Sequence, residues 1–181
     1  MIGFDGSARR DWTTLVGCTV GGAPYLWLIG NWERNPHDPD WSVPRSEVDA
    51  RVADAFARWQ VRMLAGDPAG WTSELQTWAS EYGDERVVII PQTAERMAPA
   101  ADVFRVELVS GQLTFDGSPS LARALGNAVT RETRWGLSIS KDARSSPRKI
   151  DPAIAAILAR MARDLVSANA PPKQMWRAFV A

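Results

Sequence analysis

The sequence predicts an α/β fold in which a three-strand antiparallel meander and further parallel strands form one mixed sheet with helices on both faces. Two observations predict this class. Three short apolar runs joined by turn residues fill the first 32 residues, and after residue 45 segments of helical periodicity alternate with strand-like runs. Such an order is typical of a mixed sheet covered by helices. The length of 181 residues suits one domain, and therefore one functional site.

Short apolar runs bounded by turn residues are the candidate strands. They are, in order, IGFD (2–5), TTLVGCTV (13–20), YLWLIGNW (25–32), a short stretch ending at Asp67, the β-branched run ERVVIIP (85–91) and the alternating run RWGLSIS (134–140). The turn residues GGAP join the second and third runs, which we therefore expect to be antiparallel. ERVVIIP is the clearest buried strand of the set.

Apolar residues at helical spacing define the candidate helices. They are SVPRSEVDARVADAFARWQVRML with Ser46 as N-cap, a helix opened by Trp71 and reaching Tyr82, residues 95–109 with Pro99 near the start, a helix capped by Ser118 or Ser120, and KIDPAIAAILARMARDLVSA with Asp151 as N-cap and Pro152 at the first helical position. Among the nine tryptophans, Trp27, Trp59 and Trp78 fall on buried faces, and Trp41, Trp71 and Trp176 are the candidates for exposure.

Right-handed crossovers place the first strand in the centre of the sheet, with the strand that ends at Asp67 parallel beside it. Asp5 and Asp67 then lie at the same end of adjacent strands, where ligands bind in such sheets, and Asp151 caps the last helix. Carboxylates on strands ~5 Å apart repel each other unless a cation lies between them. Gly6 would leave room for a phosphate or an ion to approach the backbone.

This constellation predicts a site for Mg²⁺ or Mn²⁺, which prefer oxygen ligands. Three acids can hold two ions, and a metal pair activates water on one side of a phosphodiester and stabilises the leaving oxygen on the other without histidine. Each acid also has an ordinary structural interpretation. Asp67-Pro68 can be a turn, Asp151-Pro152 a helix cap, and Asp5 a turn residue.

Composition narrows the function classes. The single cysteine, Cys18, lies in an apolar run and excludes an internal disulfide or a Cys-rich zinc site, and the single histidine, His37, lies in a loop between prolines. The 21 basic and 21 acidic residues cancel, so any anion-binding surface must be local. No run approaches the ~20 apolar residues of a membrane span. The first strand begins at residue 2, which suits a domain of a longer chain.

Several motifs in this order resemble the nuclease domain of the large terminase subunit of tailed bacteriophages, within the ribonuclease H-like superfamily. They are GFDGSARRDWTTLVG, WSVPRSEV, DPAGW, YG before a buried strand, LTFDGSPSLARALGNAV and KIDPAIAAILA. The resemblance implies that residues 1–168 form the nuclease domain and 169–181 a C-terminal tail. It also implies that Asp5, Asp67 and Asp151 are the metal-binding and catalytic acids. Members often have His before the Asp-Gly pair where this chain has Phe115, so no role at the site is expected for Asp116.

The resemblance further implies cleavage of concatemeric double-stranded viral DNA during genome packaging in the host cytoplasm. The implied partners are an ATPase motor domain, the portal and the small terminase subunit. The phosphate-binding loop G-x-x-x-x-G-K-[ST] is absent from the sequence, so ATP hydrolysis is not assigned to it.

Basic residues near the acids are candidates for the DNA backbone. They are Arg9, Arg10, Lys141, Arg144, Arg148 and Lys149. Asp11 and Lys149 are candidate second-sphere partners of the acids.

Two alternatives stay open at this stage. One is a ribonuclease H-like transposase, integrase or junction resolvase. The other is a non-catalytic module that docks the motor on the portal.

Overall fold

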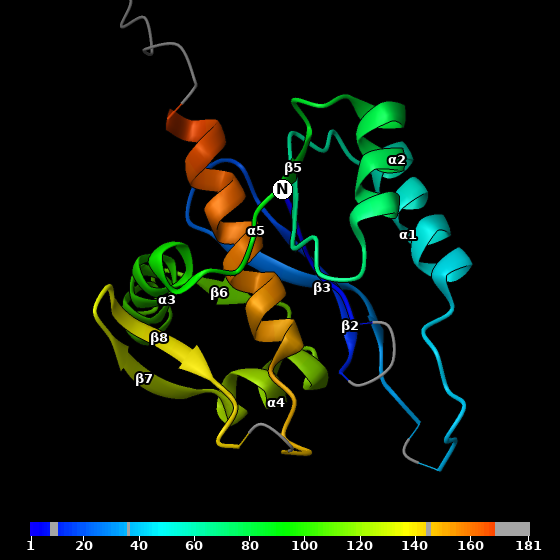
Figure 1. Cartoon of the computed structure of the whole chain (residues 1–181). Helices are drawn as coiled ribbons and strands as arrows, with labels where there is room; N and C mark the ends of the chain where they lie inside the picture. Colours follow the sequence, from blue (N-terminus) through cyan, green and yellow to red (C-terminus); the bar gives the residue numbers. More distant parts are fainter. Residues whose placement is uncertain (8–10, 36, 144–145, 169–181) are drawn as a thin grey trace, which may run out of the picture.

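The computed structural model describes residues 1–7, 11–35, 37–143 and 146–168. A six-stranded mixed sheet lies between two groups of helices, with α1 and α2 on one side and α3, α4 and α5 on the other (Figure 1). The α/β class and the helices on both faces, predicted from the sequence, are confirmed.

The strands of the sheet follow the order β5-β4-β1-β2-β3-β6. They are β1 (Ile2–Asp5), β2 (Thr13–Cys18), β3 (Tyr25–Trp32), β4 (Leu64–Gly66), β5 (Val87–Ile89) and β6 (Thr114–Phe115). β1, β2 and β3 form the antiparallel meander, and β4 pairs parallel to β1 with Phe4 opposite Gly66. The predicted central position of β1 is therefore confirmed.

Alternation along β1 assigns each of its residues to one face of the sheet. Ile2 and Phe4 belong to the core formed with α1 (Arg45–Arg58) and α2 (Thr72–Tyr82). The opposite face carries a second core with α3 (Ala94–Val109), α4 (Pro119–Asn127) and α5 (Asp151–Ala168). Asp5, two residues beyond Gly3, therefore shares the α5 face of the sheet with Gly3.

The backbone of α5 rests directly on β1 at Gly3. A Cβ atom built at this glycine would stand 1.9 Å from the carbonyl oxygen of Ala155 and 2.4 Å from the nitrogen of Ala159. Ala155, Ala159 and Ala162 recur at helical spacing and are fully buried, so small side chains permit the close approach. Because no side chain separates the helix from the strand, the start of α5 lies at a fixed distance from the end of β1.

Several helix starts differ from the sequence-based expectation. α1 begins at Arg45, and the carbonyl of Pro44, with no capping side chain, accepts its first backbone bonds; Ser46 is therefore not the N-cap. The carbonyl of Ile150 accepts the first bonds of α5, so Asp151 is the first helical residue rather than its cap. The expected Ser118 does occupy the cap position of α4.

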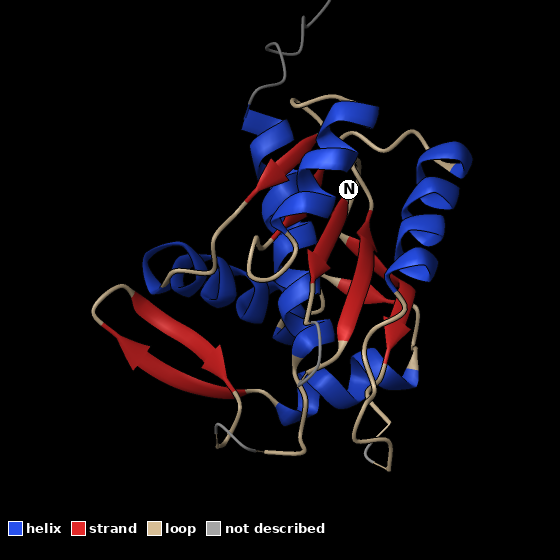
Figure 2. Cartoon of the chain, turned by 45° about the vertical axis from the view of Figure 1, so that its right-hand side comes forward, coloured by secondary structure: helices blue, strands red, loops and turns tan. Residues whose placement is uncertain are grey.

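The run RWGLSIS does not join the main sheet. It forms β8 (Gly136–Ser140), which pairs only with the antiparallel β7 (Val129–Thr133) among the described strands. Figure 2 shows this hairpin standing apart from the six-stranded sheet. β7 was not expected, because VTRET has no apolar face, and β6 was missed because it has two residues. β5 is an edge strand with Ile89 exposed, so its β-branched composition overstated its burial.

None of the helices in the described part of the chain is long and apolar enough to cross a membrane.

Gly3→Ala is expected to destabilise the protein by at least about 2 kcal/mol, because the new methyl group meets backbone atoms that cannot rotate away. Urea unfolding followed by circular dichroism measures the effect. Gly126→Ala, within α4, is the matched control, because a Cβ there meets nothing within 4 Å and alanine favours a helix. Equal stability of the two variants would contradict the backbone contact.

Candidate active site

Asp5 and Asp67 follow adjacent parallel strands at the same edge of the sheet. Asp5 is the last residue of β1, and Asp67 comes directly after β4. The backbone nitrogen of Asp67 donates to the carbonyl of Phe4 at 3.4 Å, which extends the parallel pairing by one step. The two carboxylates are thus brought together as the predicted topology requires.

A third parallel strand contributes Gln92, which the sequence analysis missed. Its side-chain Nε2 donates to Oδ1 of Asp5 at 2.7 Å, and its backbone nitrogen donates to Oδ1 of Asp67 at 3.1 Å. Gln92 follows Pro91 at the carboxyl end of β5, the strand beside β4. Gln92 could have been predicted from its position at the end of a parallel strand, at the same edge of the sheet as the two acids.

Asp151 opens α5 and is 8% exposed. Its Oδ2 atom is buried and has no hydrogen-bond partner among the described residues. A buried carboxylate oxygen without a donor is costly, and natural proteins rarely leave one unsatisfied without a reason such as an ion.

The acids influence one another's ionisation. Burial, and next the negative charge of Asp151, raise the pKa of Asp5 well above its usual value, while the hydrogen bond from Gln92 opposes the rise. The charges of Asp67 and Asp11 add to the effect. Burial raises the pKa of Asp151 to about 6, again with a contribution from Asp11. The site is therefore an electrostatically frustrated group of carboxylates that favours a positive charge among them.

Asp11 pairs with two lysines from a distant segment. Lys141 Nζ lies 2.8 Å from Asp11 Oδ1, and Lys149 Nζ bonds to the same oxygen. Burial alone would raise the pKa of Asp11, but the two lysine hydrogen bonds lower it below the usual value. The lysine charges also oppose the rise in the pKa of Asp151, so the pair lies beside the acids.

The other candidate DNA contacts divide into two groups. Arg148 is exposed and lies 3.8 Å from Asp142 in the same loop. Arg9, Arg10 and Arg144 lie outside the described residues.

Gly6 does not leave space for an ion. A Cβ at Gly6 would stand 2.4 Å from Trp71 Nε1 and 2.6 Å from Phe4 Cζ, so the indole fills the position beside the glycine. The expectation of an exposed Trp71 is also wrong, because this side chain is fully buried against Phe4 with 5.0 Å between ring centroids. Glycine is needed here so that the turn after Asp5 can pack on the indole.

Asp116, for which no role at the site was expected, makes structural hydrogen bonds. Its carboxylate accepts hydrogen bonds from the backbone nitrogens of Leu28 and Ser118, which join β3 to the start of α4.

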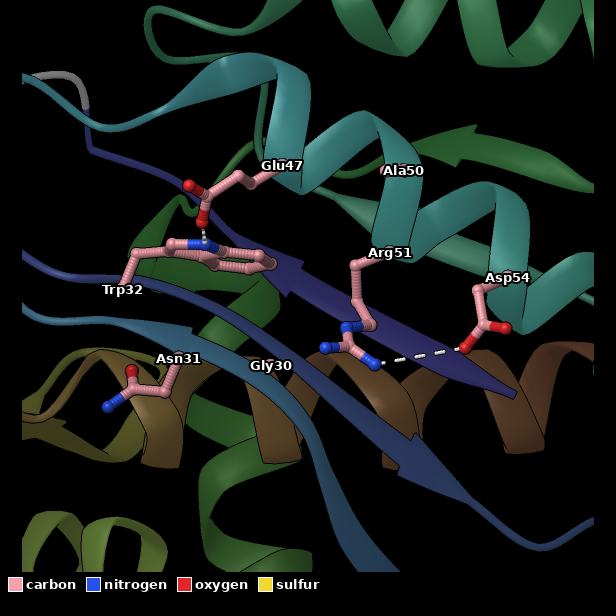
Figure 3. A pocket seen from close by; sticks show the side chains of 7 residues that line it. All are labelled: Gly30, Asn31, Trp32, Glu47, Ala50, Arg51 and Asp54. Atoms are coloured by element: carbon pink, nitrogen blue, oxygen red, sulfur yellow. Dashed lines mark hydrogen bonds and ion pairs between the residues drawn. The ribbon is translucent and has the colours of Figure 1, made fainter.

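A groove of about 440 Å³ lies between β3 and α1, and none of the acids described above lines it (Figure 3). Trp32 lines this groove and donates to Glu47 at 3.2 Å, and Arg51 pairs with Asp54 at 3.8 Å.

The acids at the carboxyl edge of the sheet are the candidate metal ligands. Within residues 1–7, 11–35, 37–143 and 146–168, no three Asp, Glu, His or Cys side chains already stand close enough to hold an ion. The donor set nevertheless suits a hard divalent cation, because it consists of carboxylate oxygens and includes the unpartnered Oδ2 of Asp151. The acids therefore fit Mg²⁺ or Mn²⁺ chemically, and ion binding requires them to move closer together.

Solved structures share this architecture. The crystal structure of the HK97 bacteriophage large terminase matches 87% of this chain and 38% of that chain, with a TM-score of 0.67 and 21% identity. The large terminase nuclease from thermophilic phage G20c with bound magnesium matches 88% of this chain and 79% of that one, with a TM-score of 0.61 and 14% identity. The chain has the fold of a large terminase nuclease domain. The resemblance inferred from the motifs is thus confirmed at the level of the fold.

A second comparison finds a relative that is much longer than this chain. The Gene 13 protein of Mycobacterium phage L5 is 32% identical over 173 residues, which cover 90% of this chain and 29% of that protein. This chain therefore spans less than a third of that relative. No protein-family model matches the sequence.

Asp151→Asn is expected to stabilise the metal-free terminase fold by about 1–3 kcal/mol at pH 7, and to have little effect at pH 4. The native pKa of about 6 exceeds the usual 3.8, so the native state retains a proton that the unfolded chain releases. The contribution of protonated Asp151 to the stability of the native state is therefore fully present below about pH 4, and it is lost as the pH rises through about 6.

Urea unfolding at both pH values in chelator measures this difference. Asp84→Asn, at an exposed turn position, removes the same charge away from the cluster and is the control. A destabilised Asp151→Asn protein at pH 7 would contradict the uncompensated burial of this carboxylate.

Proposed function

We propose that this chain is the nuclease domain of a phage large terminase, and that it cuts concatemeric double-stranded DNA with Mg²⁺ or Mn²⁺. The observation that carries the proposal is the meeting of buried, mutually repelling acids at the carboxyl edge of a terminase nuclease fold. The orphaned oxygen of Asp151 supports it. Asp67 also has an ordinary turn role, because its Oδ2 accepts from the backbone nitrogen of Ala69 at 3.4 Å. A cap role does not account for Asp151, because the carbonyl of Ile150 accepts the first bonds of its helix.

The three acids have distinct roles in the proposed site. Asp5 lies close to both of the other acids, since the charges of both act on it, and it would contact two ions. Asp67 and Asp151 would each complete one ion's ligands. When bound, the ions supply an activated water and neutralise the charge that develops on the leaving oxygen of the phosphodiester.

The chain's own contribution is to hold these carboxylates in place. The parallel pairing of β1 with β4 fixes the backbone of Asp5 relative to that of Asp67. The contact of α5 with Gly3 fixes the height of Asp151 above the same strand. The backbones that carry the acids are thus held in place, so only their side chains would have to move to bring the oxygens onto an ion.

Lys141 and Lys149 are the proposed contacts to the DNA backbone. Both lie beside Asp151, and Asp11 holds both side chains in one place. A double-stranded DNA whose phosphate reaches the acids would therefore meet two ammonium groups. Such contacts position DNA without reading its sequence.

The wider context of the chain is also a proposal. The length of the L5 relative suggests a larger protein, for which an ATPase motor domain is the expected companion. The portal and the small terminase subunit would be its partners, and the host cytoplasm its location.

Asp5→Asn is expected to lower the rate of Mg²⁺-dependent cleavage of linear duplex DNA by at least about 10³-fold, because it removes a carboxylate that would hold the ions. Agarose gel assays with and without chelator measure the loss, and Asp84→Asn should retain full activity. Chelator-resistant cutting would contradict the proposal. Preferential cutting of four-way junctions would favour a resolvase. End joining would favour a transposase or integrase. A protein that binds no metal, and whose function survives Asp67→Asn, would favour a docking module.

Lys141→Met and Lys149→Met are each expected to weaken binding of duplex DNA by Asp5→Asn protein and to reduce the slope of log K against log salt by about 1. Fluorescence anisotropy at several salt concentrations measures both quantities. Arg105→Met, on the exposed side of α3 with Asp102 as its ion-pair partner, is the control. An unchanged slope for both lysine variants would exclude them from the DNA interface.

A further inference from the structure

Gln92 joins the two strand-end acids through separate groups. Its side-chain amide donates to Asp5 at 2.7 Å, and its backbone nitrogen donates to Asp67 at 3.1 Å. Any residue except proline can supply the backbone bond. The bond to Asp5 depends on the glutamine side chain.

The fold itself does not require this side chain. Gln92 is exposed and belongs to neither hydrophobic core. The strand before it is already fixed by its pairing with β4 and by the bond from the Ile90 nitrogen to the Gly66 carbonyl, at 2.8 Å. An exposed amide can bond to water at little cost, so its engagement with Asp5 points to a role at the acids.

The chemistry of the amide suits that role. Asp5 is repelled by Asp151, Asp67 and Asp11, and without a restraint its carboxylate would turn away from them. A lysine or arginine would restrain it but would add a positive charge that repels an incoming cation. The neutral amide donates to Oδ1 and adds no charge, and Asp5 retains further lone pairs for an ion.

We propose that Gln92 is a positioning residue that orients the Asp5 carboxylate for divalent-metal binding. The inference rests on the proposed function, because it assumes that Asp5 is a metal ligand. Hydrogen-bond partners of metal ligands typically change metal affinity by about 10–100-fold when they are removed. Removal of the Gln92 amide is expected to have an effect in this range, since it supplies a direct hydrogen bond to Asp5.

Gln92→Met tests the proposal, because methionine keeps the length of the side chain and lacks the donor. Calorimetric titration with Mn²⁺, without DNA, should give a Kd about 10–100-fold weaker than that of the wild type. Gln92→Ala should behave in the same way, which excludes an effect of the methionine sulfur. Gln76→Met, on the exposed face of α2, is the control and should bind Mn²⁺ as the wild type does.

Two further measurements separate positioning from a structural role. The thermal midpoint of metal-free Gln92→Met should stay within a few degrees of the wild type. Its cleavage of duplex DNA should fall at low Mn²⁺ and recover as Mn²⁺ approaches saturation. Unchanged or tighter Mn²⁺ binding, or lost cleavage that high Mn²⁺ does not restore, would overturn the proposal.

The failure of this inference differs from the failure of the proposed function. If the wild type binds Mn²⁺ and Asp5→Asn abolishes binding, but Gln92→Met binds equally well, only the role of Gln92 is wrong. If the wild type binds no Mn²⁺ that depends on Asp5, both proposals are overturned.

Discussion

The direct contact between α5 and Gly3 determines the rest of the structure around the acids. Helices normally pack on sheets through side chains, and their separation then varies with the residues between them. Here a strand glycine meets the helix backbone, with alanines on the helix side. The start of α5 can therefore move neither toward β1 nor away from it without breaking the contact. The position of Asp151 is fixed in turn. Its distance from Asp5 therefore depends on the packing contact at Gly3, two residues before Asp5.

The same rigidity explains why the acids remain close despite their repulsion. A flexible loop would relieve the repulsion by moving a carboxylate into water, whereas β1, β4 and the first turn of α5 allow little movement of the backbone. Part of the folding free energy is therefore used to keep the charges together. Proteins commonly concentrate such local destabilisation at functional sites and compensate for it in the core. The two hydrophobic cores, one on each face of the sheet, provide that compensation.

The sequence predicted the parts of the fold that depend on local pattern and chain connectivity. The position of β1, the parallel neighbour ending at Asp67 and the helix beginning near Asp151 followed from apolar runs and right-handed crossovers. The environment of Gly6 could not be predicted, because the indole that fills it comes from Trp71, more than 60 residues away. The hydrogen bond from Gln92 to Asp5 and the pairing of Asp11 with Lys141 could not be predicted either, since each depends on exact side-chain directions at the sheet edge. β7 lacked any apolar pattern and was missed for that reason.

The lengths of the outer strands have a consequence for how copies of the molecule meet. The main sheet ends in β5, with three residues, on one side and in β6, with two, on the other. An unpaired edge is a template onto which another chain can add a strand, and short edge strands are one way in which proteins limit this. Few backbone groups are thus free at either border of this sheet. Copies of the molecule can therefore lie close together without their sheets joining edge to edge.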